Sequence, residues 1–552
     1  MKPGVMDPVL GGIDDGRTFR LAQRLGFAGV EVVVSRDQLR SPDRLEALQR
    51  ARAGTGLAVP SLVLGEHSDR GGVADTEPVV AERACEDIEQ AVRWAAELGA
   101  DAILVPFFGR AELVDDGDVE RAAAALRPLC ERAAERGVTL CYEGTLAAQR
   151  ISVLAARVGS SAFGCYFDLA NPVTRGMDTA TEIRALGDLV RRVHFKDARV
   201  RVGDARPGLG LVDFSASTEA LAEIGYDGWL VLETPPGPPE LVARDLSFAR
   251  SVLPALDWTT AWPHLGIFTY DFGPGEWDAL AETCRLTGLQ AVQLGDPLLG
   301  ECLGRADQID PVVERLEADG ISIAALAGYR NLVAPDPDKR RRNIDFIAQC
   351  LELAPRFGTS IVATETGTRH AGGDWTDSPD NWRAETWELL DDAIGELVPI
   401  AERSGAILAV EASVKNILRT PGQLLGLLER FPSEHLQVVC DPYNYLSSQL
   451  LPARERLTAT FLRRFEHRFV LGHLKDVDPG GAETGTGEFG SGVFPQGVYL
   501  EFLAERRPDL PLILEHLPLD HVPEAARRVR ELADQYVRTT LSVSSGRLST
   551  SS

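Results

Sequence analysis

The chain contains 552 residues, 44% of them hydrophobic, and its formal net charge at pH 7 is -25. This length is too great for a single hydrophobic core, so two large domains are expected. The negative charge argues against nucleic acid as a partner, because phosphate contacts need a basic surface.

The sequence also lacks the features of a membrane or secreted protein. No apolar stretch approaches the length of a membrane span, and the first residues do not join a basic region to an apolar one. The eight cysteines form no CxxC pair and lie mostly in apolar segments. They are typical of reduced thiols in the core of a cytoplasmic protein.

In the first half, short apolar runs alternate with longer amphipathic segments. A short strand is expected at residues 3–7, and further strands at 29–34, 58–64, 102–108, 138–144, 163–169, 191–197 and 229–235. Helical patterns such as 15–27 and 79–100 separate them, and a glycine comes before each following strand.

The second half repeats this alternation. Its strands are expected at residues 265–272, 291–296, 321–328, 360–367, 406–413, 436–444, 469–476 and 511–517. Eight strands separated by helices, over roughly 260 to 290 residues, is the count of a (β/α)8 barrel. The strands are continuously apolar, which fits a parallel sheet covered by helices. A doubly wound open sheet would need a glycine-rich phosphate loop after its first strand, and the sequence has none there.

The sequence therefore predicts an α/β protein of two tandem (β/α)8 TIM barrels. The expected division is residues 1–257 for the first barrel, 258–541 for the second and 542–552 for a small, polar, disordered tail. The boundary is placed near residues 252–264, where one helix ends and the next strand begins. The proline-rich segment 234–240 directly follows the eighth strand and is interpreted as an active-face loop.

One four-residue pattern occurs in both halves, at the ends of the last four strands. The sets are Glu143, Asp168, His194 and Glu233, then Glu411, Asp441, His473 and Glu515. Three carboxylates and one imidazole form a hard, oxygen-rich site for a divalent cation. The carboxyl ends of barrel strands build the catalytic face, so each set is expected to converge on one ion. A single such carboxylate is equally typical of a salt bridge or a helix cap, but four in order, found twice, disfavour that interpretation.

Both halves resemble the xylose isomerase-like barrels. This group includes sugar-phosphate isomerases and epimerases, ketose 3-epimerases, hydroxypyruvate isomerase and inosose dehydratase. The resemblance rests on the two quartets and on the segments LGFAGVEV, VHFKD and GYDGWLVLE, then DPYN at 441–444, HLKD at 473–476, GTGEFG at 485–490 and LILEHL. The second half also carries AGYRNLVAPD and VATETGT, which resemble a less characterised branch of the group.

The resemblance implies one divalent metal ion per barrel (Mn, Mg, Co or Zn), bound by the quartets. It also implies a sugar isomerase or epimerase in which a metal-stabilised enediolate follows removal of a proton from carbon. The paired carboxylates would act as base and acid: Glu143 with Glu233, and Glu411 with Glu515. Each would bind the metal through one oxygen and use the other for proton transfer.

Two lysines accompany the quartets. Lys196 and Lys475 lie two residues beyond the metal histidine, on the same strand face. A cation there can pair with a ligand carboxylate or stabilise an oxyanion during catalysis, and a salt bridge to the following strand is the alternative. Asp197 and Asp476 point the other way and are expected to support loops.

Three further residues are candidates for substrate binding: His67, Asn171 and Asn444. Ketose epimerases usually carry a histidine three residues after the strand-six aspartate, where this chain has Asn171 and Asn444. An amide binds a hydroxyl but cannot take a proton at neutral pH. A modified, oxidised or phosphorylated sugar, or a cyclitol, is therefore as compatible with the sequence as a free ketose. Glycine-rich segments at 205–210 and 485–490 follow the seventh strands, where barrels often bind phosphate, although such segments are also common in loops.

Several functions stay open. A lyase related to inosose dehydratase would begin with the same proton abstraction as an isomerase. One barrel could be catalytic and the other a scaffold or regulatory module, because the halves differ outside the quartets. An apurinic endonuclease of the same superfamily is rejected, since it needs a zinc cluster and many histidines in one barrel. The expected partner is a small sugar-like molecule, without nucleic acid or membrane, and a homo-oligomer is compatible with the sequence.

Overall fold

The structure is a computed structural model that describes residues 1–11, 14–253 and 262–547, with side chains described up to residue 535. The chain divides into two compact units, Met1–Thr260 and Ala261–Ser552. The expected boundary between residues 257 and 258 lies outside the described residues, as do residues 548–552 of the expected tail. No described helix has the length and apolar character needed to cross a bilayer.

The first unit contains a closed barrel of parallel strands, each paired with the next and the last with the first. In chain order the strands are β1 (Lys2–Met6), β2 (Gly29–Val33), β3 (Leu62–Val63), β4 (Ala102–Phe107), β5 (Thr139–Gly144), β6 (Phe163–Asp168), β7 (Val190–Phe195) and β10 (Trp229–Leu232). The strand expected at 58–64 shortens to two residues, because Pro60 has no N–H to donate to a ladder.

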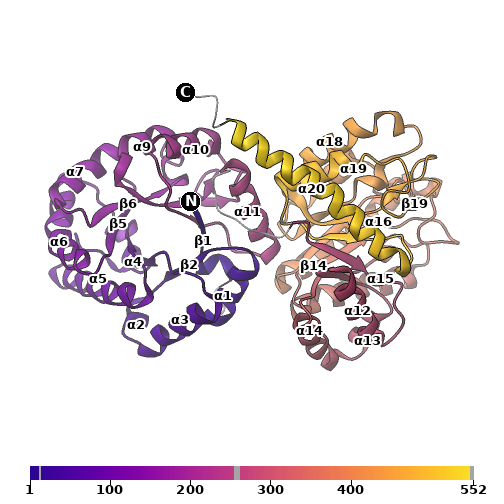
Figure 1. Cartoon of the computed structure of the whole chain (residues 1–552), viewed down its shortest axis with the longest axis horizontal. Helices are drawn as coiled ribbons and strands as arrows, with labels where there is room; N and C mark the ends of the chain where they lie inside the picture. The colour runs from indigo at the N-terminus through magenta and orange to yellow at the C-terminus, as the bar shows by residue number, and fades with distance from the viewer. Residues whose placement is uncertain (12–13, 254–261, 548–552) are drawn as a thin grey trace. The chain divides into compact units, whose positions relative to one another are not determined.

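Helices surround this barrel (Figure 1). They are α1 (Asp15–Arg24), α2 (Arg36–Leu39), α3 (Pro42–Thr55), α4 (His67–Arg70), α5 (Pro78–Leu98), α6 (Asp116–Ala134), α7 (Ala148–Val158), α8 (Ala170–Val173), α9 (Thr179–Leu186), α10 (Phe214–Glu223) and α11 (Pro239–Val252). Every residue of β4 is buried, since its inner side chains fill the barrel and its outer ones meet the helices. Gly99 ends α5 with a positive φ of 68°, a conformation that costs glycine little.

The second unit forms another closed parallel barrel. Its strands are β11 (Leu265–Phe268), β12 (Ala291–Leu294), β13 (Ser322–Ala327), β14 (Ile361–Glu365), β15 (Ile407–Glu411), β16 (Leu436–Cys440), β17 (Phe469–Leu474) and β20 (Leu512–Leu514). Its helices are α12 (Trp277–Thr287), α13 (Leu298–Gly304), α14 (Ile309–Ala318), α15 (Pro337–Leu353), α16 (Ala384–Ser404), α17 (Pro421–Arg430), α18 (Arg454–Phe465), α19 (Gln496–Arg506) and α20 (Val522–Arg547). The prediction of two tandem TIM barrels is confirmed.

Each barrel has a small antiparallel ribbon after its seventh strand. The ribbons are β8 (Asp197–Ala198) with β9 (Val202–Ala205), and β18 (Asp476–Val477) with β19 (Thr486–Gly487). Their first residues, Asp197 and Asp476, are almost completely buried. Both accept hydrogen bonds from backbone N–H groups of the loop that follows, so the expected support of loops by these two aspartates is confirmed.

Candidate active site

The quartet of the first barrel comes from four neighbouring strands. Glu143 lies in β5, Asp168 ends β6, His194 lies in β7 and Glu233 directly follows β10. One nitrogen or oxygen atom from each of the four side chains lies within 4.8 Å of all the others. Consecutive strands of a closed parallel barrel end at the same rim, and this brings together residues that are far apart in sequence.

Lys196 and His194 hold the carboxylates of this group in place. His194 Nδ1 lies 3.2 Å from Glu143 Oε1 and 2.8 Å from Glu233 Oε2. Lys196 Nζ lies 2.6 Å from Glu233 Oε1 and 3.5 Å from Asp168 Oδ2. The other oxygen of Asp168 accepts hydrogen bonds from the backbone N–H groups of Ala170 and Asn171.

Burial and neighbouring charges separate the pKa values of these groups. Burial raises the pKa of the Glu143 carboxyl to about 7. Burial also acts to raise the pKa of Glu233, but Lys196 and His194 overcome it and lower that pKa to about 2. For His194, burial favours the neutral ring, yet the surrounding glutamates raise its pKa well above the usual value. The site therefore concentrates negative charge around one imidazole.

The back of the His194 ring contacts a residue that is not in the quartet. His194 Nε2 lies 2.7 Å from Oε2 of Glu31, a completely buried residue of β2. The other oxygen of Glu31 accepts hydrogen bonds from Ser61 Oγ and Tyr166 Oη, both at 2.5 Å. A charge inside an apolar strand is costly to bury without partners, and this is the sequence signal that could have identified Glu31.

The second barrel places its quartet in the same way. Glu411 ends β15, Asp441 follows β16, His473 lies in β17 and Glu515 follows β20. Ligand atoms of the first three lie within 4.8 Å of one another, and Glu515 Oε1 lies 3.3 Å from His473 Nδ1. Lys475 Nζ is 2.7 Å from both Asp441 Oδ2 and Glu515 Oε1.

Different groups surround the second quartet. His473 Nε2 lies 2.9 Å from Oε1 of Gln293, the residue of β12 that takes the place of Glu31. Tyr329 donates a hydrogen bond of 2.8 Å to Glu411 Oε2, and Asn444 Nδ2 donates one of 2.5 Å to Glu411 Oε1. Both oxygens of Glu411 therefore have partners. Burial, followed by the charge of Asp441, raises the pKa of Glu411 well above its usual value.

The second barrel has a further carboxylate, at the end of its fourth strand, that has no counterpart at the matching position of the first barrel. Glu365 ends β14 in register with Glu411, whereas Pro106 holds the matching position beside Glu143. Asn416 donates to Glu365, and burial raises the pKa of Glu365 to about 7. Its position at the end of the apolar run 360–365 was visible in the sequence, but it lacked a counterpart in the first half.

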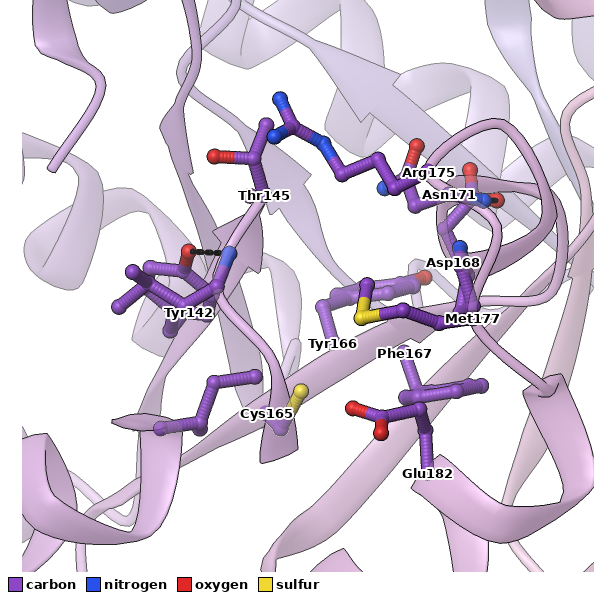
Figure 2. A pocket seen from close by; sticks show the side chains of 14 residues that line it. Tyr142, Thr145, Cys165, Tyr166, Phe167, Asp168, Asn171, Arg175, Met177 and Glu182 are labelled. Carbon is purple, nitrogen blue, oxygen red and sulfur yellow. Dashed lines mark hydrogen bonds between the residues drawn. The ribbon is translucent and has the colours of Figure 1, made fainter. Parts of the chain in front are cut away.

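The predicted substrate residues are placed differently from one another. His67 is buried in α4, with its Nε2 3.6 Å from Asp87 of α5. Asn171 lies beside Asp168 and lines a pocket in the first barrel (Figure 2). Asn444 binds Glu411, as described above. The substrate roles of these residues stay predictions.

Figure 2 shows the pocket beside Asp168, with the Arg175 side chain extending across its upper part towards Thr145. Arg175 pairs with Glu112, and Thr145 donates to the same carboxylate. These polar side chains lie next to the strand ends that carry the quartet.

Both quartets suit a divalent metal ion. Asp168 Oδ2, Glu233 Oε2 and Glu515 Oε1 are buried, and no described residue gives them a well-directed hydrogen bond, although lysine or histidine nitrogens lie near. Oxygen-rich sets with one imidazole are the ligands of Mn, Mg and related ions. The fold and its site thus define a (β/α)8 barrel with a carboxylate–histidine centre at the carboxyl ends of its strands.

The family model for the xylose isomerase-like TIM barrel matches residues 19–252 and 281–534. The chain belongs to this family, and each barrel is one copy of it. The resemblance found in the sequence is therefore confirmed.

Curated relatives of the chain include a dehydratase and epimerases. An inosose dehydratase of Lacticaseibacillus casei is 28% identical over 171 residues, which is 27% of this chain and 57% of that protein. A 2-epi-5-epi-valiolone 7-phosphate 2-epimerase of Actinoplanes sp. is 38% identical over 21% of this chain and 43% of that protein. A putative L-ribulose-5-phosphate 3-epimerase of Escherichia coli is 29% identical over 39% of this chain and 81% of that protein. The chain thus spans about half the length of the first two.

Solved structures similar to parts of this chain include the 3-keto-D-glucoside 4-epimerase of E. coli. It is 21% identical with a TM-score of 0.40, and the match covers 46% of this chain and 99% of that one. An L-ribulose 3-epimerase is 22% identical with a TM-score of 0.38, covering 47% of this chain and 88% of that one.

Proposed function

We propose that this protein is a metal-dependent isomerase or epimerase that acts on a sugar-like substrate with a carbonyl next to a hydroxyl group. Glu143, Asp168, His194 and Glu233 would hold the ion in the first barrel, and Glu411, Asp441, His473 and Glu515 in the second. A bound divalent ion supplies stabilisation for negative charge that develops on substrate oxygens.

The convergence of three carboxylates and one histidine at the strand ends carries this proposal. Glu143 and Glu233 both lie near Nδ1 of His194, at 3.2 and 2.8 Å. Each carboxylate has two oxygens, so one can bind the ion while the other takes or returns a proton. Lys196 fixes the position of Glu233 through the 2.6 Å contact and keeps positive charge near the substrate oxygens.

Solvent exchange tests the shared first step. The protein, supplied with Mn²⁺ in D₂O, is incubated with keto-sugars, their phosphates and inososes, and deuterium at carbon is measured by NMR. We expect incorporation with at least one substrate. Glu143→Gln should lower exchange by about 10²- to 10⁴-fold if the first barrel acts on that substrate, and Glu411→Gln if the second does.

Glu97→Gln provides the matched control, because Glu97 is an exposed residue of α5 and should leave exchange unchanged. Exchange that persists in the Glu143→Gln, Glu411→Gln double variant would contradict the roles of these carboxylates.

A lyase is the second candidate function. The match to an inosose dehydratase over 171 residues favours it, and a dehydratase starts with the same proton removal. The same incubations distinguish the two reactions by mass spectrometry. A product 18 mass units (about one water) lighter than its substrate indicates a lyase, and an unchanged mass indicates an isomerase or epimerase.

A further inference from the structure

The two proposed metal centres differ behind their histidines. In both, Nδ1 faces the quartet carboxylates, while Nε2 faces a residue of the second strand. That residue is a carboxylate in the first barrel, Glu31, and an amide in the second, Gln293. This difference is independent of the quartets, which consist of the same residue types in the same order.

The hydrogen-bond directions around His194 follow from the chemistry of Glu31. An ionised carboxylate only accepts hydrogen bonds, so Nε2 must donate its hydrogen to Glu31 Oε2. A histidine that binds a metal ion is neutral and has one N–H, so with an ion bound the lone pair of His194 would be on Nδ1, the nitrogen that lies near Glu143 and Glu233. Ser61 and Tyr166 both donate to the second oxygen of Glu31, which fixes the carboxylate from behind.

The directions in the second barrel follow from Glu411. Its carboxylate accepts from the Tyr329 hydroxyl, so the Tyr329 oxygen is left to accept from Gln293 Nε2 at 3.3 Å. Gln293 Oε1 then accepts from His473 Nε2, and the lone pair of His473 is again on Nδ1. These hydrogen bonds give His473 the same tautomer as His194, but the group that accepts from His473 Nε2 is the neutral amide of Gln293.

We infer that Glu31 is a positioning residue that strengthens His194 as a metal ligand, and that Gln293 is its weaker counterpart for His473. A charge-assisted hydrogen bond is stronger than a neutral one, and the distances agree, at 2.7 Å for Glu31 and 2.9 Å for Gln293. Carboxylates behind a ligating histidine orient the ring and raise its donor strength. The inference rests on the proposed metal function and adds that the two centres are unequal.

Co²⁺ alone is the probe, because its visible absorption reports the ligand field. In the full chain with Asp441→Ala, which removes a ligand of the second centre, we expect Glu31→Gln to lower Co²⁺ affinity by about 10- to 100-fold. Affinity is measured by competition with a chelator. The d–d bands of the bound ion should also shift, and a purely structural role of Glu31 would leave them unchanged in the fraction that still binds.

The reciprocal variant, Gln293→Glu, tests the same inference in the second barrel, so the test does not depend on whether Glu31→Gln folds. In the full chain with Asp168→Ala, Gln293→Glu should raise Co²⁺ affinity of the second centre and move its d–d bands towards those of the first. Tyr166→Phe, which removes one of the two hydrogen bonds to Glu31 Oε1, should lower affinity less than Glu31→Gln.

The outcomes are separable. A parent chain that binds no Co²⁺ at either centre refutes the proposed function itself. A parent chain that binds Co²⁺, with affinities and spectra that neither Glu31→Gln nor Gln293→Glu changes, refutes the positioning role and leaves the proposed function standing.

Discussion

Asp7 links the fold of the first barrel to pH through one partly buried side chain. It directly follows β1, and its Oδ1 accepts a hydrogen bond of 3.0 Å from the backbone of Val33 in β2. Burial raises the pKa of Asp7 to about 7, although Val33 and Arg44 act to lower it. The folded protein therefore binds a proton at this position more strongly than the unfolded chain does.

This shift predicts a loss of stability as the pH rises. The folded pKa lies above the unfolded value, so the contribution of Asp7 is fully present below the unfolded pKa and is lost as the pH rises through about 7. Asp7→Asn cannot ionise, and its amide oxygen can still accept from Val33. Below about pH 4 the two proteins should differ little in pH dependence. Between about pH 4 and pH 7 the wild type should lose about 1.4 kcal/mol per pH unit relative to the variant, and above about pH 7, where Asp7 is ionised in both states, the two curves should run parallel again.

Urea denaturation at a series of pH values measures this difference. Asp14→Asn is a suitable control, because Asp14 is an exposed cap of α1 and asparagine caps a helix equally well. Parallel curves for the wild type and Asp7→Asn between pH 4 and 7 would contradict the assignment to Asp7.

At the scale of single residues, the sequence predicted the quartets and the lysines beside them, but not the second-strand residues behind the two histidines. Glu143, Asp168 and their counterparts stand at strand ends, where polar residues after apolar runs are conspicuous. Gln293 is different, because an uncharged residue inside an apolar run carries no distinctive signal. Its importance depends on the contact with His473, 180 residues away in sequence, and only the folded barrel brings them together.

The loop after the seventh strand is the clearest repeated element outside the strands. In the first barrel, Asp197 Oδ2 accepts from the backbone N–H groups of Gly208 and Gly210, and Oδ1 accepts from Ala198 and Val212. These glycine N–H groups bond to the protein itself. They do not support the weak suggestion that the segment 205–210 binds phosphate.

Replacing Asp197 should therefore remove hydrogen bonds that hold this loop against the barrel. In Asp197→Asn, an NH₂ group replaces one oxygen that accepts two backbone hydrogen bonds, leaving buried donors unsatisfied. We expect the free energy of unfolding of the first barrel to fall by about 3 kcal/mol, measured by urea denaturation.

The neighbouring Asp213 supplies the matched control. Its exposed carboxylate caps α10 by accepting from Ala216, and Asp213→Asn should change stability by less than about 0.5 kcal/mol. Equal effects of the two substitutions would contradict the special role of Asp197.

At the scale of elements, the alternation of apolar runs with amphipathic segments predicted every barrel strand. The strands are buried between the barrel interior and the surrounding helices, so each one is a continuous apolar run in the sequence. Several strands are shorter than expected, among them β3, where Pro60 interrupts the ladder, and β11, β16 and β20. The ribbons after β7 and β17 were not predicted, since two-residue strands leave no periodic pattern. They depend on Asp197 and Asp476, whose partners are backbone groups that a sequence does not distinguish.

The whole molecule contains two barrels with separate cores and separate quartets. We expect two divalent ions per wild-type chain and one in each of Asp168→Ala and Asp441→Ala, because each substitution removes a ligand from one barrel. Metal content after dialysis against Mn²⁺, measured by mass spectrometry, tests this expectation. One ion in the wild type, retained in only one of the two variants, would show that a single barrel binds metal.

The matching aspartates also bear on how such a chain can acquire new specificity. Asp197 accepts hydrogen bonds from Gly208, Gly210 and Val212, and Asp476 accepts them from Gly490 and Phe494. Each loop is therefore held through glycine N–H groups and through a residue two positions before the next helix. The backbone between each aspartate and these contacts is a loop whose two ends are held in the same way in both barrels. We expect the middle of this loop to tolerate replacement by the loop of the other barrel, or a change in length, without displacing the strand before it or the helix after it.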